Sequence, residues 1–398
     1  MLTICLFMAI LPPTRAAAAP APPTVTAAAA ILVDSTTGTI LYEKACHARR
    51  PPASTTKIMT AILALERGNL DDVVTASERA SKTQFGSLHV KPGEKFTLRD
   101  LLYALLMRSA NDAAVCIAEH IAGSEEAFVA MMNEKAEAIG AKDTHFVNPH
   151  GLHAEGHYST AYDLALMARY AAAIPQFNEM VCTKNHRITR SISTLDVTLR
   201  NTGRLLWRFD GADGIKTGYT KQAGHCFVGS ATREGWRLIA VVLKSGSCLD
   251  DTCALLDYGF KHHKLVCFAR EGLVATRMPV RGGVETAVDL VAAQSLGKVV
   301  RAGDSVKIKR ELDGQRATAP LAEGERVCML TGYVNDVRVG SVPLVAACTV
   351  DRTFAYSAWI WTRNLVVVSA ILLAVYLSYG TAVAEASRRR RRRLSTGG

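Results

Sequence analysis

Three short segments of this chain carry residues that could work together in nucleophilic catalysis. They are Ser54-Thr55-Thr56-Lys57, Ser109-Ala110-Asn111 and Lys216-Thr217-Gly218. Together they offer a hydroxyl nucleophile, an amine base, a second hydroxyl that can relay a proton, and a cation for an anionic substrate group. A hydroxyl is a weak nucleophile until a neighbouring group takes its proton. The chemistry therefore depends on which of these side chains meet in space.

The first segment supplies a nucleophile and a base at helical spacing. If Ser54 opens a helix, Lys57 lies three residues on, on the same face and within reach of the Ser54 oxygen. To act as a base, Lys57 must be neutral near pH 7. Burial and a nearby cation both lower the pKa of an amine, and Lys216 is the candidate for that cation. The three segments together are typical of serine β-lactamases and penicillin-binding proteins, with Ser-Ala-Asn here in place of Ser-Asp-Asn.

Longer stretches around these segments narrow the comparison. The chain resembles the D-alanyl-D-alanine carboxypeptidases, the low-molecular-mass penicillin-binding proteins, over roughly residues 28 to 350. The matching stretches are residues 30–44, 49–60, 91–106 with 108–112, Asn148-Pro-His-Gly-Leu152 and Tyr158-Ser-Thr-Ala161. The resemblance implies a mixed α/β (α+β) fold: a β-lactamase/transpeptidase-like catalytic domain, followed by a small all-β domain.

The resemblance also implies a mechanism. Ser54 would attack the carbonyl between the last two D-alanines of a peptidoglycan stem peptide. Lys57 would take its proton, and Ser109 would relay that proton to the leaving D-alanine. Water would then release the acyl-enzyme. β-Lactam antibiotics would be covalent inhibitors, and no cofactor or metal is implied.

A second group of residues would bind the substrate. Asn111 would hold the substrate amide and help to position Lys57, while Lys216 and Thr217 would bind the terminal carboxylate. The backbone N–H groups of Ser54 and Tyr219 would form the oxyanion hole. Glycines in the same region would let backbone approach the substrate, and the candidates are Gly214, Gly218 and Gly224.

One departure from the family concerns the carboxylate. Relatives commonly carry an arginine just past the strand that follows Lys-Thr-Gly. Here that segment reads Ser245-Gly-Ser-Cys-Leu-Asp-Asp-Thr252, with two acids and no arginine. Carboxylate binding is therefore expected to depend more heavily on Lys216 and Thr217, and an altered activity stays open.

Composition fits a two-domain exported protein. The chain has 398 residues, more than one domain usually holds. Of these residues 49% are hydrophobic, which is sufficient for a full core. Its net charge is +11, but Arg388–Arg393 contributes six of these charges, so the rest of the chain carries 11 − 6 = +5. Because the charge lies mainly in one terminal run, we do not expect nucleic acid as a partner.

Both ends of the chain suggest a membrane. Residues 1–19 read as a signal peptide, although no basic residue precedes the apolar run; a disordered Ala/Pro-rich tail is the alternative for residues 16–28.

Residues 365–384 hold no charge, and about 20 residues span the roughly 30 Å of a hydrocarbon core. Tyr356, Trp359 and Trp361 precede this stretch, and the arginine run follows it. This predicts a single-pass anchor with the catalytic body outside and the Arg-rich C-terminus in the cytoplasm. A buried core helix is the alternative.

The elements between these ends must position the site. We expect strands over 31–42, 213–231 and 236–244, and helices over 54–66, 98–121 and 125–139, with Ser109 at a break within the second helix. Short β-branched runs over 264–350 indicate a small β-sandwich-like domain. The predicted organisation is a signal peptide over 1–19, a catalytic domain over 28–262, a β domain over 264–350, a transmembrane anchor over 365–384 and a cytoplasmic tail over 385–398.

Cysteines and histidines leave alternatives open. Ten cysteines lack zinc spacing, and their disulfide pairing is not settled; Cys116 and Cys226 read as core residues. His145, His150 and His157, with His153, cluster in a Gly- and Pro-containing loop, and we favour a structural role over a metal site.

Two other functions compete with a carboxypeptidase. A β-lactamase needs fast deacylation, and no E-x-x-L-N segment supplies the glutamate of class A enzymes. A non-catalytic or weakly active penicillin- or peptidoglycan-binding scaffold is allowed by the missing arginine.

Overall fold

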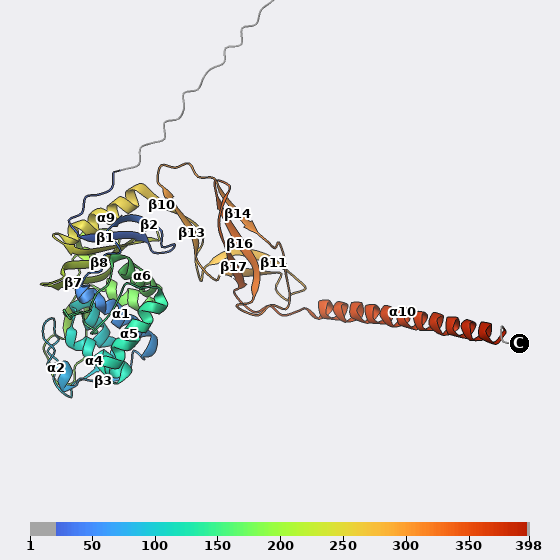
Figure 1. Ribbon diagram of the computed structural model, residues 1–398, viewed down its shortest axis with the longest axis horizontal. Helices are drawn as coiled ribbons and strands as arrows, with labels where there is room; N and C mark the ends of the chain where they lie inside the picture. The colour runs from blue at the N-terminus through green and yellow to red at the C-terminus, as the bar shows by residue number, and fades with distance from the viewer. Residues whose placement is uncertain (1–20, 396–398) are drawn as a thin grey trace, which may run out of the picture. The chain divides into compact units, whose positions relative to one another are not determined.

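The computed structural model describes residues 21–395, with side chains up to residue 387 (Figure 1). The predicted signal peptide over residues 1–19 lies outside the described residues. The chain forms two compact units. The first runs to Leu265 and includes Val299–Asp304, and the second comprises Val266–Lys298 and the chain from Ser305 onward.

A five-stranded antiparallel sheet forms the centre of the first unit. Its order is β2-β1-β9-β8-β7, which leaves β7 at one edge. The strands are β1 (Ala29–Asp34), β2 (Ile40–Lys44), β7 (Ala212–Thr220), β8 (Gly224–Arg233) and β9 (Trp236–Ser245). The single strand predicted over 213–231 is thus two strands, because the chain reverses at residues 221–223 and Gly224 adopts a φ of +69°.

Strands β1 and β9 are buried on both faces of this sheet, which explains why they are apolar almost throughout. Alternate side chains of a strand point to opposite faces. Ile31 and Val241 enter a large core shared with most of the helices, whereas Leu32 and Val242 pack against the helix α9 (Cys248–His262) on the other face (Figure 1). The edge strand β7 is thus hydrogen-bonded, through β8, to a buried central part of the sheet.

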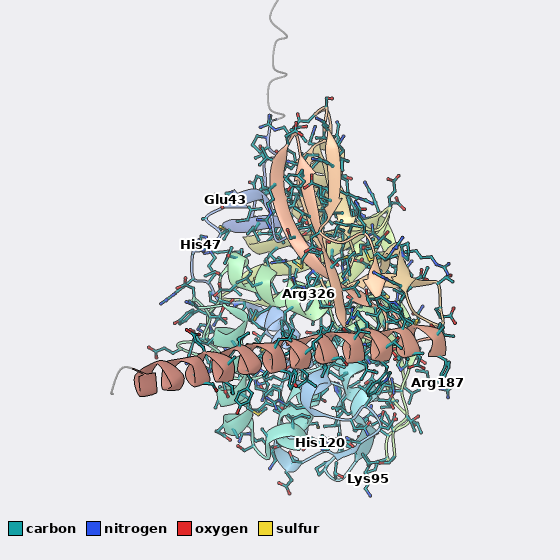
Figure 2. All side chains as sticks on the ribbon, turned by 90° about the vertical axis from the view of Figure 1, so that its right-hand side faces the viewer. Glu43, His47, Lys95, His120, Arg187 and Arg326 are labelled. Atoms are coloured by element: carbon teal, nitrogen blue, oxygen red, sulfur yellow. The ribbon has the colours of Figure 1, made fainter. Side chains whose placement is uncertain are left out.

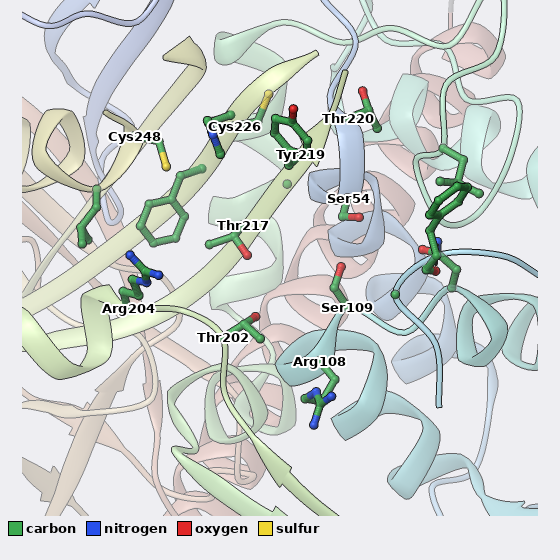
Figure 3. Close-up of a pocket in the computed structure, with 18 residues that line it drawn as sticks. Ser54, Arg108, Ser109, Thr202, Arg204, Thr217, Tyr219, Thr220, Cys226 and Cys248 are labelled. Atoms are coloured by element: carbon green, nitrogen blue, oxygen red, sulfur yellow. Dashed lines mark hydrogen bonds between the residues drawn. The ribbon is translucent and has the colours of Figure 1, made fainter. Parts of the chain in front are cut away.

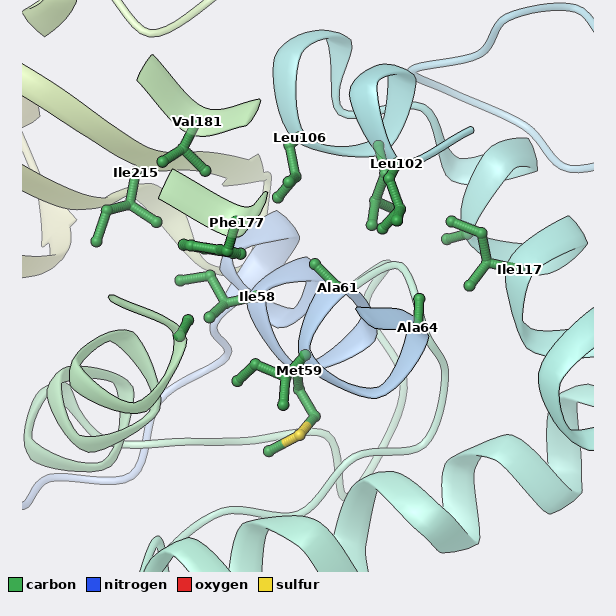
Figure 4. Close-up of a cluster of buried hydrophobic side chains, with 14 of the residues drawn as sticks. Ile58, Met59, Ala61, Ala64, Leu102, Leu106, Ile117, Phe177, Val181 and Ile215 are labelled. Atoms are coloured by element: carbon green, nitrogen blue, oxygen red, sulfur yellow. The ribbon is translucent and has the colours of Figure 1, made fainter. Parts of the chain in front are cut away.

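The helices of the large core surround α1 (Lys57–Arg67), whose residues Ile58, Met59 and Ala61 are fully buried (Figure 4). Its predicted stop is confirmed, because Gly68 leaves the helical conformation. The other elements are α2 (Glu78–Ser81), α3 (Leu98–Tyr103), α4 (Asn111–Ala122), α5 (Glu125–Ile139), α6 (Ala161–Ala172), α7 (Pro175–Cys182) and α8 (Leu205–Arg208), with the two-stranded sheets β3 (Val73–Thr75)–β4 (Lys95–Thr97) and β5 (Asn185–Arg187)–β6 (Thr198–Arg200). Exposed charged side chains such as Glu43, Lys95 and Arg187 project from this unit (Figure 2).

The helix predicted over 98–121 breaks where the second chemical segment lies. After α3 the chain forms a π-helical turn, η2 (Ala104–Arg108), and Ser109 adopts a left-handed φ of +62° before α4 begins. Non-glycine residues in this conformation are uncommon and often functional. The predicted break at Ser109 is confirmed.

The second unit is built around a six-stranded sheet with the order β14-β16-β17-β12-β11-β15. Its strands are β11 (Val274–Arg281), β12 (Ala287–Ala292), β14 (Ile308–Leu312), β15 (Ala317–Thr318), β16 (Arg326–Val334) and β17 (Val337–Ala346). β10 (His263–Ala269) and β13 (Leu296–Arg301) form a separate pair. The predicted turn at Asn335-Asp336 joins β16 to β17, and both residues have positive φ, as a tight hairpin requires.

The chain ends in one long helix, α10 (Phe354–Ser395). Its segment Phe354–Ser387 is long and apolar enough to cross a membrane, with a mean hydropathy of 2.1 and no buried side chains in the most apolar stretch. Tyr356 and Trp359 stack near its start, and the Arg281 guanidinium lies over both rings. A β-lactamase/transpeptidase-like domain, an all-β domain and a C-terminal apolar helix make up the predicted fold class, which is confirmed.

Candidate active site

Ser54 lies in a tight turn that leads directly into α1. The turn is the 3₁₀ helix η1 (Ala53–Thr56), and Lys57 is the first residue of α1. The Thr55 and Thr56 hydroxyls tighten the turn by donating to the carbonyls of Pro52 (2.7 Å) and Ala53 (2.8 Å). As the spacing predicts, the Lys57 amine lies 3.0 Å from the Ser54 hydroxyl oxygen.

The Lys57 amine is fully buried and makes three polar contacts. Besides Ser54, it donates to Asn111 Oδ1 at 2.7 Å and to the His150 carbonyl at 2.6 Å. A neutral amine has two N–H donors and one lone pair. Because both carbonyl oxygens can only accept, they use the two donors and leave the lone pair for the Ser54 hydroxyl. This geometry suits a base that takes the Ser54 proton.

Electrostatics favour that neutral form. Burial lowers the pKa of Lys57 well below the usual value for lysine, and the nearby charge of Lys216 lowers it further, while Asp112 opposes the shift. The sequence-based expectation named both burial and Lys216 as causes. Burial contributes the larger share.

Asn111 has all of its amide hydrogens in use. Its Nδ2 donates to the carbonyls of Gln84 (3.0 Å) and Phe85 (2.5 Å), which fixes Oδ1 toward Lys57. Asn111 therefore anchors the loop that carries Phe85 and also holds the Lys57 amine in place. Only the second lone pair of Oδ1 is left for a substrate N–H.

The third segment lies on the edge strand β7, next to η1. A Cβ on Gly218 would lie 2.9 Å from the Ser54 amide nitrogen, so glycine is required for this close approach. Tyr219 follows at the edge, 61% exposed, with its ring 4.6 Å from that of His225. The other two glycines do not face the site: Gly214 meets the Val181 side chain, and Gly224 lies beside Lys244.

Lys216 belongs to the same strand and is buried. Its side chain is 2% exposed, and its amine donates to the Thr217 carbonyl at 2.9 Å. Burial lowers the pKa of Lys216 to about 7. Its charge is therefore only partly retained at neutral pH.

A cavity of about 510 Å³ joins the three segments. In Figure 3 the hydroxyls of Ser54, Ser109 and Thr217 face one space. No Asp or Glu lines this cavity in the described part of the chain. Because Arg108 and Arg204 line it instead, the charged side chains of the lining are positive and suit an anionic ligand. Its other lining residues, which the sequence did not single out, include Phe85, Gly86, Arg108, Leu152, Thr202, Arg204, Thr220, His225, Phe227 and Leu249.

The loop that carries His150 and His157 packs against η1. His157 contacts the Thr56 hydroxyl at 2.9 Å through Nε2, and its Nδ1 accepts from the Val147 amide. Burial lowers the pKa of His157 to about 4 and that of His150 to about 3, so both rings are neutral. A Cβ on Gly151 would lie 2.0 Å from the Ala53 carbonyl, so this loop packs tightly under η1.

The cysteines do not pair in the described residues, where all nine are free thiols. Cys116 and Cys226 are buried as predicted. Cys226 and Cys248 line the cavity, but burial raises the pKa of both thiols, which disfavours the reactive thiolate.

Family models match most of the chain. The model for D-alanyl-D-alanine carboxypeptidase matches residues 16–247, which include all three chemical segments. The model for the C-terminal domain of penicillin-binding protein 5 matches residues 264–352.

Individual relatives agree with these matches. D-alanyl-D-alanine carboxypeptidase DacF of Bacillus subtilis is 33% identical over 305 residues, 74% of this chain and 78% of that protein. DacD of Escherichia coli is 34% identical over 343 residues, 82% of this chain and 87% of that protein. Among solved structures, penicillin binding protein 5 from Haemophilus influenzae is similar with a TM-score of 0.64 at 29% identity, covering 83% of this chain and 99% of that one.

Proposed function

Because the chain belongs to the D-alanyl-D-alanine carboxypeptidase family, we propose that Ser54 is the nucleophile with which this serine hydrolase removes the terminal D-alanine from peptidoglycan stem peptides. The observation that carries the proposal is the contact of the Ser54 hydroxyl with a buried lysine amine whose two N–H donors are already used. Trimming the stem peptide in this way limits cross-linking.

The proposed steps use Lys57 and the residues that line the cavity. Lys57 takes the Ser54 proton as the oxygen attacks the carbonyl carbon of the penultimate D-alanine, and the N–H groups of Ser54 and Tyr219 bind the oxyanion. When the tetrahedral intermediate collapses, Ser109 passes the proton to the nitrogen of the leaving D-alanine. An ester between Ser54 and the shortened peptide remains. Water attacks this ester, which releases the product and restores the Ser54 hydroxyl.

The carboxylate of the substrate is the recognition element. Thr217 lines the cavity, and Lys216 precedes it on β7 and donates to its carbonyl, so we assign the binding of the terminal carboxylate to these two residues. The same cavity accepts β-lactams, which carry a carboxylate next to their reactive carbonyl, as covalent inhibitors.

The long C-terminal helix supports anchorage in the membrane. The uncharged stretch 365–384 spans the hydrocarbon core, and the arginine run 388–393 stays in the cytoplasm because positive charge resists translocation. The catalytic body then lies outside the cytoplasm, where peptidoglycan is.

Labelling with a fluorescent penicillin tests the nucleophile. The wild-type protein should form a long-lived covalent adduct at Ser54, whereas Ser54→Ala should lose both the adduct and carboxypeptidase activity. Lys57→Ala should be almost as inactive, because the two residues act as a unit. Ser81→Ala, on α2 outside the cavity, is the matched control.

The same experiment separates the alternatives. A folded Ser54→Ala protein that still becomes fully labelled would remove Ser54 from this role. An unlabelled wild type would favour a non-catalytic scaffold, and rapid loss of the label would favour a β-lactamase.

A further inference from the structure

The segment that lacks the family's arginine, residues 245–252, contributes only Cys248 and Leu249 to the lining of the cavity and no charged side chain. Asp251 accepts hydrogen bonds from the amides of Thr26 (2.9 Å) and Ala27 (2.9 Å) and from two hydroxyls, so it fastens the start of the first unit to α9. Asp250 accepts from the Ser247 hydroxyl at 2.5 Å. Both acids are used structurally. Neither acid lines the cavity, and the segment offers no cation to a carboxylate there, so the missing cation has to come from another part of the fold.

Lys216 is a weak candidate for supplying that charge alone. Its amine is buried, already donates to the Thr217 carbonyl, and has a pKa of about 7. A guanidinium, in contrast, keeps its charge over the working pH range of proteins and matches a carboxylate with two parallel N–H donors.

Arg204 lies on the Thr217 side of the cavity (Figure 3). Its side chain makes no hydrogen bond or ion pair with any other described residue, so its donors are available. We propose that Arg204 binds the terminal carboxylate of the substrate together with Thr217, in place of the arginine missing from residues 245–252. This inference rests on the proposed function and names a residue that determines its specificity.

The backbone around Arg204 is firmly held, which makes a binding role feasible. The Thr202 amide and hydroxyl both donate to the Met107 carbonyl at 3.0 Å. The Asn201 side chain donates to the carbonyls of Val181 and Thr183, and its Oδ1 accepts from the Gly203 amide at 2.8 Å. The loop is thus tied to η2, just before Ser109, and to the end of α7. Arg204 therefore projects from a fixed point rather than from a mobile loop.

A second arginine at the cavity provides a matched control. Arg108 also lines it and has no hydrogen-bond or ion-pair partner among the described residues. In Figure 3, however, its side chain extends past Ser109, away from Thr217. If any arginine near the cavity were sufficient, the two substitutions would behave alike. The proposal requires that they differ.

The test compares two substrates that share an acyl group. One is a peptide ending in free D-Ala-D-Ala, and the other is a thioester whose leaving group has no carboxylate. Arg204→Ala should lower kcat/KM for the peptide about 10- to 100-fold, mainly through KM, as loss of a charge-assisted hydrogen bond would. The same substitution should leave kcat/KM for the thioester nearly unchanged. Arg204→Lys should recover part of the loss, and Arg108→Ala should not change the ratio of the two substrates.

Several results would overturn the inference. Equal losses of Arg204→Ala on both substrates, no loss on the peptide, or a larger selective loss for Arg108→Ala would each do so. Unfolding temperatures should match the wild type, because the Arg204 side chain is exposed and unbonded. A wild-type protein that is inactive on both substrates and unlabelled by penicillin would instead overturn the proposed function, so the two failures can be told apart.

Discussion

The amine of Lys57 shows how far the sequence predicts individual side chains. The spacing of Ser54 and Lys57 was sufficient to predict their contact, because helical geometry fixes neighbours three residues apart. The role of the His150 carbonyl was not predictable in the same way. Every residue has a backbone carbonyl, so the sequence does not indicate which one will contact a given side chain. The His150 carbonyl belongs to a loop 93 residues further along the chain than Lys57. The position of Arg204 at the cavity was not predicted for a related reason: no motif near it in the sequence indicates a cavity.

The opposite needs of the two lysines predict a pH dependence of activity. Lys57 must be neutral to act as a base, and burial, which lowers its pKa, favours that form. Lys216 must be charged to attract a carboxylate, and its pKa is about 7. We expect kcat/KM for the D-Ala-D-Ala peptide to fall as the pH rises above about 7, and kcat/KM for the uncharged thioester to fall less.

The free energy of unfolding should rise above pH 7, where the activity on the peptide is expected to fall. The pKa of Lys216 is lowered by folding, so the unfolded state binds more protons between pH 7 and 10.5. The free energy of unfolding should therefore rise with pH relative to that of Lys216→Met, as urea denaturation would show. If activity and stability fell together above pH 7, unfolding rather than titration of Lys216 would be the cause.

Among the elements, those with a strong periodic pattern were predictable and the loops that complete the cavity were not. Strands β1 and β9 and helices α4 and α5 follow from apolar runs and from stops such as Gly123 and Gly140. The loop over residues 84–94, which carries Phe85, has no such pattern. Polar contacts with distant residues hold it instead, among them Asp112, which accepts from the Leu88 amide at 3.0 Å.

One buried ion pair fastens this loop to the segment before β6. Arg190 and Glu94 are 1% and 0% exposed and form two parallel hydrogen bonds of 3.0 and 2.9 Å. Burial alone would raise the pKa of Glu94, but Arg190 and the amides of Lys91 and Ser193 lower it to about 2. Arg190 also donates to the Leu88 carbonyl at 2.9 Å.

Arg190→Ala should therefore lower the free energy of unfolding by about 3–5 kcal/mol, because Glu94 would be left charged and buried without its partner. Urea denaturation measures this, and Arg187→Ala, at an exposed position on β5, is the control. Similar midpoints for the two variants would mean that the pair contributes little.

For the molecule as a whole, composition and hydropathy predicted the order of its parts. An apolar run needs no tertiary context to be recognised, and the change to short β-branched stretches after residue 264 marks the second unit. The start of α10 was harder to place. It begins at Phe354, before the uncharged run, and includes the aromatic residues expected at the membrane surface.

Truncation before Asn364 should release a soluble and active protein, because every proposed site residue precedes the anchor. Fractionation into membrane and soluble pools, followed by penicillin labelling, would show this. In intact cells, protease added outside should digest the body and spare an epitope placed after residue 393. Digestion of that epitope from outside would reverse the proposed orientation.

An anchor formed by α10, with the orientation proposed above, would also determine where the enzyme meets its substrate. A freely diffusing hydrolase encounters peptide at its bulk concentration. A body held by one helix encounters only what lies within reach of its tether, and there the effective concentration governs the rate. Diffusion in the plane of the membrane then replaces diffusion in three dimensions. The truncated enzyme would cleave dissolved peptide as well as the full chain does, yet it would no longer confine trimming to the layer of wall nearest the membrane.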